Sequence, residues 1–239
     1  MRTLTAVFLA VICGCATARA GSITVQKMNG DVSVRHGVTE VWTTVAIGDA
    51  LRPNDTMRTG KHGSATLTVQ EGTAGTIRRL TLPPEVIVDM SDVRELTREE
   101  LMLKLTMQKV RATPQQIRHD GPQISEAAVV HGTDQNHATA VAENDPQIGR
   151  SLLNGTKVLL ENGFYATGVL RTLEVFRMFP GLAAVVDNRI ALAAAMEKAN
   201  LRGEAVAEYG AIRRLEGLSA SQAALVEGRM EVLRKTNER

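Results

Sequence analysis

The chain has few aromatic residues, too few charges for a disordered protein, and little continuous apolar sequence. Aromatic residues make up 3% and charged residues 23% of its 239 positions, while 44% are hydrophobic. This composition excludes a highly charged disordered chain and a polytopic membrane protein. The compact apolar run Leu4–Ile12 is shorter than the roughly 20 residues that a membrane-spanning helix needs.

Cysteine is nearly absent, and both cysteines lie close to the start of the chain. Cys13 and Cys15 lie within the first twenty residues, just after the apolar run, so a chain cut after Ala20 contains no cysteine and no disulfide. The run Ile12-Cys13-Gly14-Cys15 also resembles a bacterial lipoprotein box. That alternative makes Cys15 the lipid-bearing first residue.

The first twenty residues have the organisation of a secretion signal. Arg2 gives a basic start, Leu4–Ile12 the apolar stretch, and Ala18-Arg19-Ala20 the small residues that signal peptidase recognises. We therefore expect cleavage before Gly21. Cleavage lowers the number of Lys and Arg residues from 28 to 26, equal to the 26 Asp and Glu residues. No net charge then draws the mature chain to nucleic acid.

Residues 22–93 alternate apolar and polar side chains over short stretches separated by turn residues. A period of two is typical of strands with one face in a core. The alternating apolar positions are Ile23, Val25, Val32, Val34, Ala65, Leu67 and Val69. Asn29-Gly30 favours a tight hairpin, because both residues tolerate positive φ. We predict a small β-sandwich or a rolled sheet.

The turn residues and the tryptophan of this zone have mainly structural roles in our interpretation. Gly48 and Gly60 can adopt backbone angles that other residues resist. Asp49 and Asp55 can accept hydrogen bonds from nearby backbone N–H groups in turns. Trp42 is interpreted first as a core anchor and second as a binding platform.

This zone resembles the FecR domain, a periplasmic β-module. The resemblance covers less than a third of the chain. The resemblance rests on Gly30-Asp31-Val32-Ser33-Val34, Trp42, Val45, Gly48-Asp49-Ala50-Leu51, Asp55-Thr56-Met57-Arg58-Thr59-Gly60 and Ser64-Ala65-Thr66-Leu67. It departs from the family pattern after Leu67. The resemblance implies signalling across the envelope, including regulation of iron uptake through a sigma factor. That role needs a transmembrane segment and a cytoplasmic region, and we do not expect it to transfer.

A capping box predicts a helix over residues 98–111. The Thr97 hydroxyl can bond a free N–H of the first turn, while the Glu100 side chain reaches back to the N-cap. The apolar face is wide; it comprises Leu101, Met102, Leu103, Leu105, Met107 and Val110. Pro114 follows the helix closely. We expect this helix to dock against the sheet, with a Met-rich partner-binding stripe as the alternative.

Residues 113–148 show neither the apolar alternation of a strand nor the apolar spacing of a helix, and their Pro and Gly residues indicate a mobile linker. Three histidines lie there: His119, His131 and His137. A metal site needs ligands held in a fixed shell, and no H-x-x-x-H spacing occurs.

Ser64 has no G-x-S-x-G context, and Asp89 and Asp92 are explained by capping. We predict no cofactor and no enzyme; a metal-dependent enzyme using the linker histidines is the less favoured alternative.

From residue 149 onward the apolar spacing becomes helical. The pairs of helices resemble degenerate tetratricopeptide (TPR) repeats, with the better match at Leu192-Ala193, Met196, Glu204-Ala205, Tyr209 and Ile212. Leu192 and Met196 correspond to Gly155 and Leu159 at a spacing of 37 residues. The resemblance implies a groove between helices that holds a protein or peptide. An ordinary helical bundle is the alternative.

These features predict an exported α+β protein of four parts. They are a signal peptide (1–20), a FecR-like β domain with a docked helix (21–112), a linker (113–148) and a TPR-like helical domain (149–239). We expect a non-catalytic interaction, scaffold or sensing module in the bacterial envelope, periplasmic or secreted. The candidate partner-binding residues are Leu192, Met196, Tyr209 and Trp42. The alternative is a glycan- or peptidoglycan-binding lipoprotein that contacts the membrane only through lipid on Cys15.

Overall fold

The computed structural model describes residues 22–71, 76–112 and 145–237, and in these ranges a β-sandwich precedes a set of helices. The strands form two antiparallel sheets of four, so the predicted α+β class is confirmed. Sheet A has the order β4-β1-β6-β7 and sheet B the order β3-β2-β5-β8. Their bounds are β1 (Ser22–Asn29), β2 (Val32–His36), β3 (Trp42–Thr44), β4 (Ala50–Leu51), β5 (Asp55–Thr59), β6 (Ser64–Glu71), β7 (Thr76–Leu82) and β8 (Ile87–Asp89).

The alternating apolar side chains of both sheets meet in one core. Val25 and Leu67, which pair across β1 and β6, are 1% and 0% exposed. Val34 and Met57, which pair across β2 and β5, are 2% and 0% exposed. The four side chains belong to one buried cluster, so the two sheets face each other as a sandwich.

The predicted hairpin at Asn29-Gly30 is wrong. Strand β1 pairs with β4 and β6, whereas β2 pairs with β3 and β5, so the chain crosses from one sheet to the other at this turn. Gly30 has a φ of 66°, as expected, but a Cβ there would lie 2.3 Å from the carbonyl oxygen of His62. The turn therefore packs against the 60–63 loop rather than closing a two-stranded ribbon.

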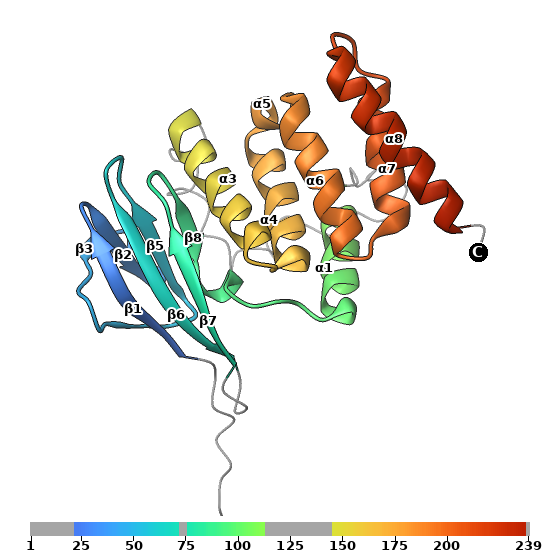
Figure 1. Ribbon diagram of the computed structural model, residues 1–239. Helices are drawn as coiled ribbons and strands as arrows, with labels where there is room; N and C mark the ends of the chain where they lie inside the picture. Colours follow the sequence, from blue (N-terminus) through green and yellow to red (C-terminus); the bar gives the residue numbers. More distant parts are fainter. Residues whose placement is uncertain (1–21, 72–75, 113–144, 238–239) are drawn as a thin grey trace, which may run out of the picture.

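Helix α3 (Pro146–Glu161) closes the open side of the sandwich, where β7 and β8 are the edge strands. Figure 1 shows it beside β8. Val158 and Leu159 of the helix, and Phe164 after it, belong to the same buried cluster as the strands. Gly155 permits the close approach, because a Cβ there would lie 2.0 Å from the carbonyl oxygen of Ile87. The helix thus covers edges that would otherwise be exposed.

Helix α1 (Arg98–Ala112) begins at the predicted capping box. The Glu100 carboxylate accepts a hydrogen bond from the Thr97 N–H at 3.0 Å, and the Thr97 hydroxyl accepts one from the Glu100 N–H at 3.2 Å. The expectation that this helix docks against the sheet is wrong. Leu101 and Leu105 are buried with the C-terminal helices, and the helix packs against α4 (Tyr165–Met178). A short 3-10 turn, η1 (Met90–Asp92), leads from β8 toward it.

Two helical hairpins repeat the same backbone hydrogen bonds 37 positions apart. The Phe164 N–H donates to the carbonyl of Leu159 at 3.0 Å, and the Leu201 N–H donates to the carbonyl of Met196 at 2.8 Å. The first hairpin consists of α3 and α4, and the second of α6 (Val186–Lys198) and α7 (Arg202–Arg213). The predicted correspondence of Leu159 with Met196 is confirmed at the level of backbone geometry.

The remaining helices extend the array away from the sandwich. They are α5 (Pro180–Ala183), which joins the hairpins, and α8 (Ala220–Asn237), which packs on α7. Figure 1 shows the helices following one another, with α8 farthest from the sheets. Their apolar faces form a second buried cluster. Within the described ranges, none of the helices is both long and apolar enough to cross a membrane.

Candidate functional site

Three of the predicted partner-binding residues lie inside the helical core. Leu192, Met196 and Tyr209 are 2%, 6% and 0% exposed, so their assignment to a groove is wrong. The residues that define a helical repeat pattern are those that pack between its helices. A partner cannot reach these side chains without opening the array.

Tyr209 instead joins three helices. Its hydroxyl donates a hydrogen bond to the Glu197 carboxylate at 2.8 Å, and Nε of Arg229 donates to the same carboxylate at 3.0 Å. Burial and the Glu197 bond raise the pKa of Tyr209 above its ordinary value. The cluster therefore holds α6, α7 and α8 together and leaves the Tyr209 hydroxyl protonated.

A groove of about 350 Å³ does exist between α3 and α6. Its lining residues are Lys157, Leu160, Glu161, Tyr165, Ala191, Ala194, Ala195 and Lys198. The floor is apolar because three of these residues are alanines from consecutive turns of α6. Small side chains allow another chain to approach the helix backbone closely. None of these lining residues is among the partner-binding residues predicted from the sequence.

The rim of the groove carries more positive than negative charge. Lys157 and Lys198 are exposed, and Glu161 is the carboxylate of the lining. The Lys198 ammonium lies 5.1 Å from the centre of the Tyr165 ring, a cation–π contact. Among the described residues, Lys157 forms no ion pair, so its charge is available to a bound carboxylate.

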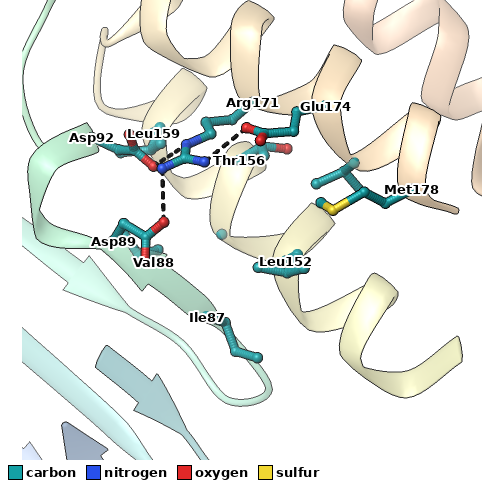
Figure 2. Close-up of a pocket in the computed structure, with 12 residues that line it drawn as sticks. Ile87, Val88, Asp89, Asp92, Leu152, Thr156, Leu159, Arg171, Glu174 and Met178 are labelled. Atoms are coloured by element: carbon teal, nitrogen blue, oxygen red, sulfur yellow. Dashed lines mark hydrogen bonds and ion pairs between the residues drawn. The ribbon is translucent and has the colours of Figure 1, made fainter. Parts of the chain in front are cut away.

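A cluster of ionised side chains lies where the helices meet the sandwich. Figure 2 shows the Arg171 guanidinium, from α4, between Asp89, Asp92 and Glu174. The hydrogen bonds are 2.7 Å to Asp89 and 2.8 Å to Glu174, with a third to Asp92. The prediction that capping explains Asp89 and Asp92 is wrong. Asp89 occupies the N-cap of η1 but forms no side-chain capping bond, and its carboxylate binds Arg171.

Burial sets the protonation behaviour of this cluster. The Asp92 side chain is 14% exposed, and burial raises its pKa to about 6 against the opposing effect of Arg171. Asp89 and Glu174 raise it further, because both carry like charge. Burial also lowers the pKa of Arg171, but the three carboxylates together raise it above its ordinary value. Arg171 is therefore always charged, and Asp92 changes charge near pH 6.

Two cavities adjoin the cluster. The one at the β8–α3–α4 junction measures about 40 Å³, which is room for a water molecule rather than an organic ligand. The other, of about 370 Å³, lies between α1 and α4 and is lined by Lys104, Met107 and Arg171 among others. Arg171 is fully engaged by carboxylates, so the cluster acts as a structural connection between the two halves of the protein.

The aspartates predicted as turn formers have that role. A carboxylate oxygen of Asp49 accepts a hydrogen bond from the Ala46 N–H at 2.7 Å, and one of Asp55 accepts from the Arg52 N–H at 2.8 Å. Trp42 does not have its predicted role as a core anchor. Its side chain is half-buried on edge strand β3, on the face of sheet B turned away from the core.

Several predicted residues fall outside the described ranges. They are Cys15 in the N-terminal segment and His119, His131 and His137 in the predicted linker. Pro146 and Gln147, assigned to the linker, belong to the first turn of α3, which Asp145 caps. In the ranges that the structure does describe, no group of three His, Cys, Asp or Glu side chains is placed to hold a metal ion.

Comparison with known proteins adds no identification. The chain matches no family model, no curated protein and no solved structure. The groove and the ion cluster therefore have to be interpreted from their own chemistry.

Proposed function

We propose that this chain is a non-catalytic binding protein of the bacterial envelope, and that its α3–α6 groove holds a segment of a protein partner. The observation that carries the proposal is an apolar groove between the first helices of two equivalent hairpins. Its volume of about 350 Å³ lies in the range of ligand-binding clefts. Binding in it requires no reactive side chain.

The chemistry of the lining defines the partner segment. The alanines of α6 and Leu160 offer apolar surface to small apolar side chains. Lys157 and Lys198 at the rim offer two ammonium groups, so the segment carries at least one carboxylate. A segment of this kind binds by its backbone shape and its charge rather than by one deep anchor.

The 37-residue equivalence of the two hairpins supports the TPR-like interpretation of the helical half. The Asp49 and Asp55 turns and the two-sheet arrangement are in keeping with a FecR-like sandwich. Placement in the periplasm rests on the secretion signal predicted in residues 1–20, and membrane anchoring through Cys15 remains the alternative. The TPR-like and FecR-like assignments, and the choice between a periplasmic and a membrane-anchored protein, are parts of this proposal.

Site-specific crosslinking tests the groove in the full chain. Ala191 is exposed on the groove face of α6, and Ala207 is exposed on α7 outside the lining. We expect a photoreactive benzoylphenylalanine at position 191 to trap a discrete protein in the producing cells. The same group at position 207 should not trap it. Equal adducts at both positions, or none at 191, contradict the proposal.

A further inference from the structure

The outer face of sheet B carries an indole ring flanked by two arginines. The guanidinium carbon of Arg58 lies 4.4 Å from the centre of the Trp42 ring, and that of Arg35 lies 5.4 Å from it. Trp42 is opposite Arg35 in the register of β3 and β2, and Ser33 is opposite Arg58 in that of β2 and β5. Because Ser33 and Arg35 are two residues apart on one strand, the four side chains share a face.

Unsatisfied polar atoms coincide with this face. Among the described residues, the buried side-chain nitrogen and oxygen atoms without a hydrogen-bond partner are Oγ of Ser33 and Nε of Arg35. Ser33 is only 8% exposed. A buried hydroxyl and a buried N–H group left without partners are rare in folded proteins and mark places where a further group is accommodated. In the strand register Arg35 is opposite Trp42, and Ser33 is opposite Thr44 of the same edge strand.

The two guanidinium groups are also poorly neutralised by the protein itself. Within the described ranges Arg58 has no carboxylate partner, and the hydrogen bond of Arg35 is a long one, 3.4 Å, to the Thr56 hydroxyl. The Thr56 hydroxyl donates to Asp89 at 2.6 Å, and that carboxylate is in turn bound by Arg171. Asp89 is therefore committed to the ion cluster, and the positive charge beside Trp42 is left for a ligand.

We propose that this face binds a carboxylate-bearing glycan. Guanidinium groups hold carboxylates by paired N–H bonds, and an aromatic ring offers an apolar surface to the C–H face of a sugar ring. The Ser33 hydroxyl lies buried beneath this face and has no hydrogen-bond partner among the described residues. The arrangement suits a sugar acid better than an acidic peptide, because the cations are placed around a ring rather than along an extended chain. This site is separate from the α3–α6 groove and does not depend on it.

The single tryptophan of the chain makes the site directly observable, because tryptophan fluorescence, excited where tyrosine does not absorb, reports Trp42 alone. We would titrate the full chain with sodium polygalacturonate, with neutral dextran and with poly-L-glutamate, and repeat each titration by calorimetry. The expected result is a saturable change with polygalacturonate and none with dextran. Arg35→Gln and Arg58→Gln should each weaken binding about tenfold. Arg79→Gln, an exposed arginine on β7 of the other sheet, should leave it unchanged.

Four results would overturn the proposal. They are no saturable change with polygalacturonate, equal binding of dextran, equally tight binding of poly-L-glutamate, and equal weakening by Arg79→Gln. If the Arg35 and Arg58 variants do not fold, the comparison of the three polymers on the unmodified chain still decides the question. Crosslinking at Ala191 is independent of this face, so failure here leaves the groove proposal standing.

Discussion

Arg171 of α4 and Asp89 of β8 are joined by a 2.7 Å ion pair between residues 82 positions apart in the chain. The same guanidinium binds Asp92 and Glu174. The ion pair connects α4, the second helix of the first hairpin, to the edge strand β8 of the sandwich. Helix α3 contacts the same strand. The two halves of the protein therefore form one continuous structure.

Removing the cation should uncouple this junction. Arg171→Met leaves three partly buried carboxylates facing one another, and we expect the free energy of unfolding at neutral pH to fall by about 2–3 kcal/mol. The matched control is Arg213→Met. Arg213 pairs with Glu227 at 3.4 Å, but these side chains are 47% and 55% exposed, so its loss should change stability by under about 0.5 kcal/mol. Urea unfolding measures both, and equal effects contradict the structural role of the cluster.

Asp92 should give the protein a characteristic pH dependence. Its pKa is raised from 3.8 to about 6, so the folded chain binds this proton more tightly than the unfolded chain. The contribution of protonated Asp92 to the free energy of unfolding is therefore fully present below pH 3.8. It is lost as the pH rises through about 6. We expect Asp92→Asn to remove this effect, so that the stability of the natural chain relative to the variant falls by about 3 kcal/mol across that interval. Parallel stability curves for the two proteins would show that Asp92 titrates normally.

The close contact of α3 with β8 depends on a single glycine. Gly155→Ala places a Cβ 2.0 Å from the Ile87 carbonyl oxygen, and the helix must move away from the strand. We expect a loss of about 3 kcal/mol or more in the free energy of unfolding. Gly228→Ala on α8 is the control, because a Cβ there meets nothing within 4 Å. It should stabilise the protein by up to about 1 kcal/mol, and a similar loss for both variants would refute the packing argument.

Local features of the fold could be predicted from the sequence. The period of two placed the buried face of the strands in which it was recognised, as Val34 and Leu67 show, and the capping box placed the start of α1. The 37-residue spacing relates two hairpins that share the same hydrogen bonds. Each of these features is set by neighbours within a few residues or by a repeated local motif.

Contacts between distant residues could not be predicted. The residues around the β1–β2 turn carry no signal that these strands enter different sheets. Likewise, the sequence around Leu101 does not indicate that it packs against the C-terminal helices rather than the sheet. Arg171 and Asp92 are 79 positions apart, and neither stands in a motif. The groove was assigned to Leu192 and its partners because large apolar residues carry the repeat pattern, whereas the actual lining is alanine-rich and inconspicuous.

The first residue of the mature protein decides how it is held in the envelope. Mass spectrometry of the purified chain should find a free N-terminus at Gly21 if the secretion signal is cleaved as predicted. A lipid-modified Cys15 would replace that prediction with the anchored alternative. An uncleaved Met1 on a cytosolic protein would contradict both and with them the envelope location.

The central claim is that the α3–α6 groove holds a protein segment, and the affinity of that segment for two variants tests it most directly. Ala191→Arg fills the groove with a long cation, whereas Ala207→Arg adds the same side chain to an exposed position outside it. With the segment trapped by crosslinking as ligand, we expect calorimetry to show binding at least about tenfold weaker for Ala191→Arg and unchanged for Ala207→Arg. Equal affinities for the two variants would contradict the account.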